Sequence, residues 1–409
     1  MRNKMHIGIL YYKEPQRLMG RHVANRSFIE ALFKYKGEHK VTVLNPDEIN
    51  IPEFLSKEPL DVLHYPGPDL YRALSLKTYN PKPMAVTGIT HTLGHAPYLE
   101  WFCMNLIFGT TESDALICTS YAAQAAIKKI SNNSIEGLRL YRLMENTINL
   151  PIIPLGVDSS SYFKAPKEDD VIRLLYLGRF CKYTKVDLFP LLEMVKEVMS
   201  KTDKKVELIL AGADSANYAK EVHAKSCELS LEMQIVTNIS GEYKRDLLSK
   251  CDIFLAPSNN TQETFGLSLL EAMASGLPIV AYDWSGYRDI VQEGVTGFLI
   301  PTTLKPKGEI LPFQYDAFNQ KQFSNCVEVD KEEFIKKTLW LIESKEVREN
   351  MAIQSLLQIK HFDWAVIIPK YIKLWQDLSS KATPSTSNLK TLDYFKVFSH
   401  YATKVALNG

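Results

Sequence analysis

The chain has 409 residues, of which 45% are apolar, and its formal net charge at pH 7 is +1. This length exceeds what one hydrophobic core usually holds, so it predicts two domains. The balanced charge excludes the broad basic surface that is typical of nucleic-acid binding, so any phosphate must be bound by a few local groups.

The first half of the chain alternates strand-like runs with helical patterns. The expected strands cover residues 6–12, 40–44, 61–65, 84–89, 115–118 and 151–155. The clearest helical patterns cover residues 23–35 and 121–130. A second series of strands follows at residues 172–177, 206–210, 234–236, 252–256, 278–282 and 298–300. This alternation predicts parallel sheets, so the sequence favours an α/β fold with two doubly wound, Rossmann-like domains.

Composition also indicates where the domains end. Residues 156–167 contain consecutive serines and Pro166, which is linker composition, and this predicts a first domain over residues 1–156 and a second over 168–360. Residues 302–330 lack clear periodicity and are expected to form a long surface excursion before a helix that starts near Lys331. Aromatic residues at helical spacing predict a further helix within residues 361–409.

The cysteines and the apolar runs bear on the compartment. The six cysteines form no C-x-x-C pair and no metal-ligand spacing with histidine: Cys103, Cys118, Cys181, Cys227, Cys251 and Cys326. This argues against zinc and against a disulfide framework, and indicates buried thiols in a reducing, cytoplasmic compartment. No apolar run reaches the roughly eighteen residues of a membrane-spanning helix. The short run before Lys13 is typical of a first strand rather than a signal peptide.

Basic residues such as Lys128 and Lys129 leave a peripheral association with the inner face of the membrane open. Such charges more often form a solvated helix face.

Two glutamates in the second half are the strongest functional signal. Glu263 lies in a loop that ends at Gly266, and Glu271 lies eight residues later in an apolar helix. On the helical period Glu271 shares a face with Leu267 and Ala274, where an apolar residue would cost less, so a polar partner is expected to meet it. The ordinary alternative is one solvated loop glutamate and one glutamate at a helix edge.

The residues that follow carry a family resemblance. Residues 276–301 alternate short β-branched strands with glycine-containing turns. Together with the Glu-x7-Glu spacing, they closely resemble the donor-binding half of family-4 glycosyltransferases. The resemblance implies the GT-B architecture, in which two Rossmann-like domains face each other across a cleft. It also implies that the first domain lies on the acceptor side, that the second binds the nucleotide sugar, and that the C-terminal helix crosses back to the first domain.

The resemblance assigns roles around the two glutamates. It implies that Glu263 contacts hydroxyls of the donor sugar and that Glu271 holds the ribose hydroxyls. It also implies backbone contacts from Thr264, Phe265, Gly266 and Leu267. A helix that begins near Leu267 leaves its first N–H groups free, and such a helix terminus attracts phosphate.

A phosphate grip is expected beyond the strand at residues 172–177. That strand leads into a loop that holds Gly178, Arg179, Lys182 and Lys185, and ligands of open α/β sheets lie beyond the carboxyl ends of strands. Arg179 can donate two parallel N–H bonds to phosphate, and Lys185 can act as a point charge. The family pattern is Gly-Arg, a short spacer and Lys, usually followed by Gly. Here the spacer is one residue longer and a valine replaces that Gly, so Lys185 is the expected ligand and Lys182 the alternative.

The first domain contributes weaker candidates. His91 ends an expected strand and resembles the family histidine that approaches the donor sugar across the cleft, with His95 as the fallback and a structural role as the ordinary alternative. The loop after the first strand holds Gly20, where many relatives carry a glycine pair that contacts the diphosphate. Its basic neighbours are candidates for the acceptor side instead: Arg17, Arg21 and His22.

These residues favour one reaction. The resemblance implies retaining transfer of a hexosyl group from a nucleotide-diphosphate sugar to a hydroxyl of a glycan, lipid-linked or protein acceptor, in the synthesis of glycans, glycolipids or glycoproteins. The catalytic set would be Glu263, Arg179, Lys185 and His91. No carboxylate is clearly placed as a covalent nucleophile, which favours a front-face mechanism in which the departing phosphate oxygen takes the acceptor proton.

No metal and no cofactor are expected, because Arg179 and Lys185 are present and no Asp-x-Asp cluster stands beside a strand end. The alternatives are another GT-B enzyme, such as a nucleotide-sugar epimerase or a glycan phosphorylase, and a non-catalytic nucleotide-sugar-binding partner subunit. The sequence gives no indication of the oligomeric state.

Overall fold

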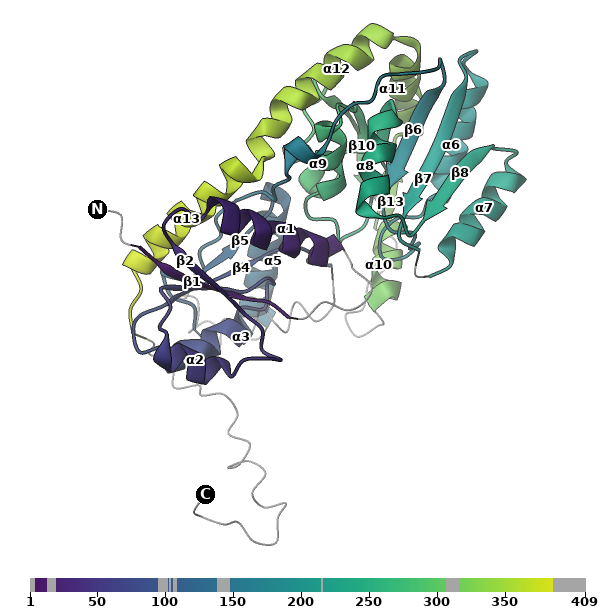
Figure 1. Ribbon diagram of the computed structural model, residues 1–409. Helices are drawn as coiled ribbons and strands as arrows, with labels where there is room; N and C mark the ends of the chain where they lie inside the picture. Colours follow the sequence, from purple (N-terminus) through teal and green to yellow (C-terminus); the bar gives the residue numbers. More distant parts are fainter. Residues whose placement is uncertain are drawn as a thin grey trace.

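The computed structural model describes residues 4–12, 20–94, 102, 104–105, 109–137, 148–214, 216–306 and 316–384. The structure has two lobes that lie side by side, and each is built around a parallel sheet (Figure 1). None of the helices in these ranges is long and apolar enough to cross a membrane.

The N-terminal lobe contains a five-stranded sheet in the order β2-β1-β3-β4-β5, with every pair parallel. Its strands are β1 (His6–Leu10), β2 (Lys40–Leu44), β3 (Val62–His64), β4 (Ala85–Ile89) and β5 (Ala115–Ile117). The surrounding helices are α1 (Gly20–Tyr35), α2 (Ile51–Lys57), α3 (Tyr71–Leu74), η1 (Ser75–Tyr79) and α5 (Tyr121–Gly137). Strands β3, β4 and β5 are buried along their whole length, as expected for a parallel sheet that is covered on both faces.

The C-terminal lobe contains a six-stranded parallel sheet in the order β11-β10-β9-β6-β7-β8. Its strands are β6 (Ile172–Leu177), β7 (Val206–Gly212), β8 (Met233–Thr237), β9 (Ile253–Ala256), β10 (Ile279–Tyr282) and β11 (Gly297–Ile300). Its helices are α6 (Phe189–Ser200), α7 (Tyr218–Glu228), α8 (Gly241–Lys250), α9 (Leu267–Ala274), η4 (Ser285–Asp289), α11 (Lys331–Glu343) and α12 (Lys345–Gln358). The chain runs outward from β6 to β8 and then returns to β9 beside β6. The strand order therefore reverses between β6 and β9, and ligands of doubly wound sheets bind at such a reversal.

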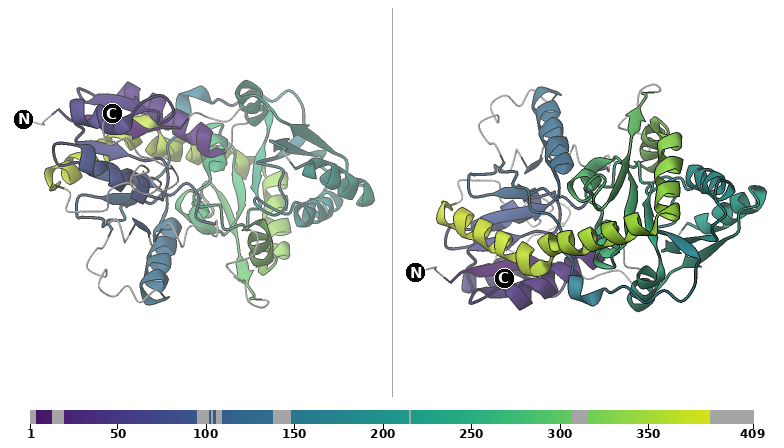
Figure 2. Two further views of the ribbon diagram at one scale, coloured as in Figure 1. Left: turned by 90° about the horizontal axis from the view of Figure 1, so that it is seen from below. Right: turned by 90° about the horizontal axis from the view of Figure 1, so that it is seen from above.

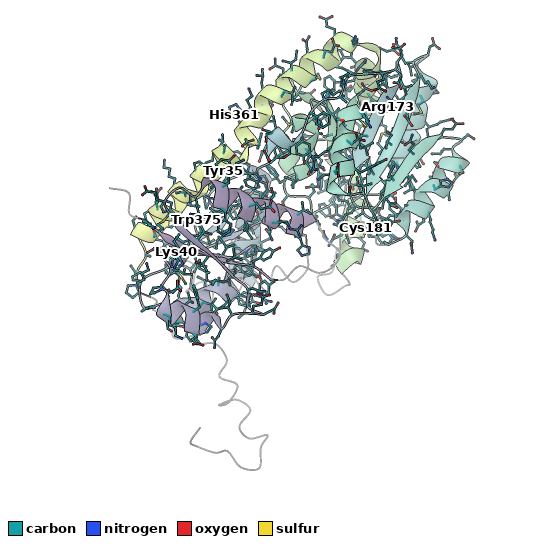
Figure 3. All side chains as sticks on the ribbon, viewed as in Figure 1. Tyr35, Lys40, Arg173, Cys181, His361 and Trp375 are labelled. Carbon is teal, nitrogen blue, oxygen red and sulfur yellow. The ribbon has the colours of Figure 1, made fainter. Side chains whose placement is uncertain are left out.

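The last described helix joins the two lobes. After η5 (Ile359–Phe362), helix α13 (Trp364–Ser380) runs from the C-terminal lobe onto the N-terminal lobe and packs against α1 (Figure 2). The indole N–H of Trp375 donates to Thr87 Oγ1 at 3.1 Å, and that of Trp364 donates to Ser27 Oγ at 2.8 Å. Trp375 is labelled in Figure 3, where α13 meets the N-terminal sheet. One hydrophobic core is consequently continuous from β1 through α13 to β9 and α9.

The segment between the two sheets is held in place. Residues Ser159–Ser161 form the short helix η3. The backbone N–H of Val157 donates to Phe362 O at 2.9 Å, and the N–H of Trp364 donates back to Val157 O at 3.1 Å. The segment with linker composition is therefore hydrogen-bonded to the residues at the start of α13.

One sequence expectation about local structure is wrong, and another omits short regular elements. Residues 151–155 form no strand and contribute only an isolated bridge between Cys118 and Ile152. Pro151 and Pro154 lack the N–H groups that a ladder needs. Residues 302–330 contain an antiparallel pair, β12 (Thr302–Leu304) and β13 (Val327–Val329), and helix α10 (Asp316–Ser324). These elements are too short for their periodicity to be read from the sequence.

Candidate functional site

The loops after β6 and β9 meet where the strand order reverses. Arg179 follows β6, and its Nη2 donates to Thr184 O at 3.3 Å within its own loop and to Gln262 Oε1 at 3.4 Å in the loop after β9. One guanidinium group therefore bridges the two loops. It places a fixed positive charge at the carboxyl ends of β6 and β9.

Lys185 and Glu263 form an ion pair between the same two loops. Lys185 Nζ contacts Glu263 Oε2, and the side chains are only 22% and 12% exposed. The hydroxyl of Tyr287, in η4, donates to the same oxygen at 3.3 Å. Burial favours the neutral acid, but the charge and hydrogen bond of Lys185, with bonds from Tyr287 and the Phe265 backbone, outweigh it, so the pKa of Glu263 lies below its usual value. The carboxylate is ionised at neutral pH.

Tyr287 stays protonated beside that carboxylate. Burial, followed by the negative charge of Glu263, raises its pKa well above the usual value. Its hydroxyl is therefore a permanent hydrogen-bond donor to Glu263.

Glu271 lies on α9 and has the polar partners that its place on an apolar helix implies. The side chain of this residue is buried, and Oε1 accepts hydrogen bonds from Lys244 Nζ at 2.5 Å and from the Tyr162 hydroxyl at 3.1 Å. Lys244 comes from α8 and Tyr162 from the segment between the sheets. Burial and the nearby Glu271 carboxylate raise the pKa of Tyr162. This buried carboxylate thus joins three separate parts of the chain.

The turn between the two glutamates requires glycine. Gly266 has φ +115°, a conformation that L side chains rarely adopt, and an added Cβ would lie 2.6 Å from the ring of Tyr287. Gly266 is also the N-cap of α9, which has no side-chain cap at this end. No cap side chain therefore accepts from the N–H groups of the first turn.

The loop after β9 also touches the N-terminal lobe. Thr264 Oγ1 donates to His91 O at 3.0 Å, and Ser120 Oγ donates to Thr264 O at 2.6 Å. A Cβ on Gly94 would lie 2.6 Å from Thr261 Oγ1, so the segment after β4 packs directly on this loop. The imidazole Nε2 of His91 lies 2.6 Å from Asn25 Oδ1, on α1. The backbone of His91 therefore contacts the loop of Glu263, while its side chain bonds to its own lobe.

A carboxylate of the C-terminal lobe caps a helix of the N-terminal lobe. Asp289 Oδ2 accepts a hydrogen bond from the N–H of Tyr121, the first residue of α5, at 2.7 Å. Burial raises the pKa of Asp289, although this bond and the charge of Arg288 act in the opposite direction. Asp289 thus connects the two lobes through the first turn of α5. This contact has an electrostatic cost, because burial disfavours the ionised carboxylate.

We expect the Asp289→Asn variant to reveal that cost in the pH dependence of stability. A raised carboxyl pKa contributes stability that is fully present below the unfolded value, about 3.9, and that is lost as the pH rises through the folded value. Asparagine keeps the acceptor oxygen and does not ionise, so the melting temperature of the variant relative to wild type should increase as the pH rises from about 4 toward neutral. Thermal melting across this range measures the difference. A difference that is independent of pH would contradict the prediction.

The remaining predicted residues are placed as follows. Gly20 is the first residue of α1. Arg17, His95 and the side chain of Arg21 lie outside the described residues. His22 lies in the first turns of α1 and is partly exposed. Lys182 Nζ is 3.6 Å from Asp187 Oδ2 and 3.9 Å from the ring centre of Phe189, so its ammonium group is held by groups other than Glu263.

Sequence reasoning missed four side chains that complete the site. Their partners are the residues named above: Lys244 and Tyr162 at Glu271, Tyr287 at Glu263, and Gln262 at Arg179. Gln262 and Tyr287 belong to segments that the sequence already indicates. Nothing in the sequence separates Lys244 from the other lysines or Tyr162 from the other tyrosines.

No candidate metal centre and no disulfide occur among the described residues. Among the described residues, no three His, Cys, Asp or Glu side chains form a group that could hold a metal ion. The five cysteines that the structure describes are free thiols, and Cys103 lies outside these residues.

Residues 159–307 match the protein family described as Glycosyl transferases group 1. They include β6 to β11 and therefore Arg179, Lys185, Glu263 and Glu271. Among curated proteins, the phosphatidyl-myo-inositol mannosyltransferase of Mycobacterium tuberculosis is 22% identical over 231 residues, which cover 56% of this chain and 54% of that protein. The sulfoquinovosyl transferase of Arabidopsis thaliana is 31% identical over 186 residues, which cover 44% of this chain and 29% of that protein. The chain thus spans about half the length of the first of these relatives.

Solved structures resemble almost the whole chain. HepE from Anabaena in complex with UDP has a TM-score of 0.62 at 16% identity, over 92% of this chain and 100% of that one. Sucrose-phosphate synthase from Thermosynechococcus elongatus also has a TM-score of 0.62 at 16% identity, over 93% and 100%. The fold is GT-B. The sequence-based fold class is confirmed, with two Rossmann-like domains and parallel sheets.

Proposed function

We propose that the protein is a retaining glycosyltransferase of the family-4 type, which transfers a hexosyl group from a nucleotide-diphosphate sugar to an acceptor hydroxyl. One observation carries this proposal. Glu263, whose side chain is 12% exposed, precedes a glycine-capped helix terminus, buried Glu271 lies within that helix, and Arg179 and Lys185 contact the same loop. The family match over residues 159–307 and the UDP bound to HepE support a nucleotide donor.

The cations would bind the diphosphate. Negative charge grows on the leaving phosphate during transfer, so preorganised cations and N–H groups stabilise the transition state more than the ground state. Arg179 is already fixed between the two loops and would need little reorganisation. The ion pair with Glu263 neutralises Lys185 in the free protein. A bound diphosphate and the Glu263 carboxylate would therefore share the positive charge of Lys185. The N–H groups at the start of α9 would complete the grip.

The two glutamates would hold opposite ends of the donor. Glu271, fixed by Lys244 and Tyr162, would accept hydrogen bonds from the ribose hydroxyls. Glu263, kept ionised by Lys185 and Tyr287, would accept hydrogen bonds from hydroxyls of the transferred sugar. His91 and Gly20 would approach from the N-terminal lobe.

We favour front-face transfer without a metal or cofactor. The anomeric carbon–phosphate oxygen bond breaks and the carbon–acceptor oxygen bond forms on the same face. The departing phosphate oxygen accepts the acceptor proton. Arg179 and Lys185 supply the positive charge that a metal would otherwise supply. A glycan, a lipid-linked sugar or a protein would be the acceptor, and the relative that acts on phosphatidyl-myo-inositol supports peripheral association with the inner face of a membrane.

We expect a chelator to leave the reaction intact. With EDTA in excess, transfer or slow donor hydrolysis should stay within about twofold of the untreated rate, because protein cations stabilise the leaving diphosphate. A screen of nucleotide sugars by product release first identifies the donor, and NMR of the product then gives its anomeric configuration. Loss of turnover with EDTA that Mg²⁺ or Mn²⁺ restores would contradict the metal-free reaction, and an inverted product would contradict retention.

Other functions would give different results in the same screen. A GT-B epimerase would convert the nucleotide sugar without an acceptor, and a phosphorylase would require inorganic phosphate. A non-catalytic partner subunit would bind the nucleotide sugar and turn nothing over.

A further inference from the structure

A cavity lies beside the loop after β6 that carries Lys185. It has a volume of about 200 Å³ and is bounded by the loop after β6, the start of α6, the ends of β9 and β10, and the excursion of α10 and β13. Figure 1 shows α10 at the edge of the C-terminal lobe, and Cys181, which is labelled in Figure 3, marks the same edge. The volume is below the range of drug-sized ligand pockets, so a ligand of this cavity would be small.

This cavity is separate from the site of the two glutamates. Tyr282 of its lining belongs to the core on the α6 side of the sheet, whereas α9, with Glu271, covers the opposite face. Neither glutamate lines the cavity, and neither do Arg179 and Lys185. The cavity is therefore not an extension of the proposed donor site.

Two ammonium groups line the cavity against one carboxylate. Lys182 lies 3.6 Å from Asp187, the only acidic residue of the lining among the residues that the structure describes. Lys321 of α10 sits 4.5 Å from the ring centre of Tyr183, and no carboxylate among the described side chains forms an ion pair with it. A dianionic phosphate, with three acceptor oxygens, would satisfy two ammonium groups better than a carboxylate with a single charge.

The lining also holds an acceptor that lacks a donor. Asn259 Nδ2 donates to Ser324 O at 3.2 Å, which fixes the orientation of the amide, and Asn259 Oδ1 is buried with no hydrogen-bond partner. A buried acceptor without a donor costs free energy, so a ligand hydroxyl would be favourable here once a small movement of the amide exposes the oxygen. The cations favour a phosphate group, and the amide favours a hydroxyl beside it.

We propose that this cavity binds a small hydroxylated phosphomonoester. The phosphate lies between Lys182 and Lys321, and a hydroxyl of the ligand donates to Asn259 Oδ1. Hydrogen bonds connect this cavity to the loops of the proposed donor site. Asn260 Nδ2 donates to Tyr183 O at 2.9 Å, and Gln262 Nε2 donates to Gln320 Oε1 at 2.9 Å. Occupancy would therefore fix the loops that carry Arg179 and Glu263.

Titration calorimetry with glycerol 3-phosphate tests the proposal without any assumption about the reaction. Saturable binding to one site per chain is expected, with weaker binding of inorganic phosphate and no measurable binding of glycerol. Lys321→Met should weaken glycerol 3-phosphate by about tenfold or more, the loss expected for one charge-assisted hydrogen bond. Lys321→Arg should restore most of the affinity, because it keeps the charge.

The matched control is Lys305→Met, which removes a lysine of the same excursion that pairs with Glu328 and does not line the cavity. It should leave the affinity unchanged. Absence of saturable binding would overturn the proposal, as would equal affinity in Lys321→Met and wild type, or inorganic phosphate binding as tightly as glycerol 3-phosphate. Displacement of the probe by UDP would place it in the donor site and would also overturn the proposal. These binding outcomes do not depend on glycosyl transfer, so each of them can be interpreted even if the protein does not turn over nucleotide sugars.

Discussion

Replacing Glu271 with glutamine should weaken the binding of the free nucleoside diphosphate by about 10- to 100-fold, because a hydrogen bond to a charged group contributes roughly 1.5 to 3 kcal/mol. The donor KM should rise with it, since the ribose is common to the nucleotide and the donor. The dissociation constant, measured by titration calorimetry, reports this directly.

The same substitution removes the charge that pairs with Lys244 and therefore needs a stability control. Thermal melting of Glu271→Gln separates lost binding from lost folding. Tyr162→Phe is the matched variant, because it removes one hydrogen bond to Glu271 and keeps both the carboxylate and Lys244. We expect it to weaken the nucleotide by less than about tenfold, in line with the loss of one neutral donor. A Glu271→Gln protein that is folded and binds the nucleotide normally would show that Glu271 is structural.

Replacing Glu263 with glutamine should have the opposite pattern. Turnover should fall by about 100-fold or more, because the carboxylate is expected to act on the sugar as charge develops on it. The nucleoside diphosphate should bind as well as before, or more tightly, because Lys185 loses the carboxylate that competes with phosphate for its charge.

Comparison of turnover with nucleotide affinity in Glu263→Gln distinguishes the two roles. If this variant loses the bare diphosphate as badly as Glu271→Gln while both remain folded, the pair supports the phosphate loop and does not divide the donor between sugar and ribose. Tyr287→Phe is the matched control, because it removes the second donor to Glu263 and leaves the ion pair with Lys185.

The sequence predicts the C-terminal sheet well for a physical reason. Its central strands β6, β9 and β10 are almost wholly buried, so they appear as short apolar runs between turns, and the observed β6 has the predicted bounds of residues 172–177. The run at 151–155 has similar composition, but its prolines prevent a ladder. The excursion at 302–330 depends on tertiary contacts, such as the bonds between Asn259 and Ser324.

The candidate site can also be predicted from the sequence only in part. The position of Glu271 on an apolar helix face predicts a polar partner, because a buried charge without one is costly. The identity of the partners does not follow, since Lys244 is 27 residues away and Tyr162 is 109 residues away in the chain. The interlobe bond between Asp289 and the first turn of α5 spans 168 residues and has no local sequence signature.

The position of the donor site at the strand-order reversal is the central claim, and Arg179 tests it most directly. Titration calorimetry compares the affinity of the free nucleoside diphosphate for wild type and for Arg179→Ala. Arg179→Ala should weaken the diphosphate by about tenfold or more, because it removes a charged donor that bridges the loops after β6 and β9. Unchanged affinity in a folded Arg179→Ala protein would contradict the claim and move the diphosphate away from these loops.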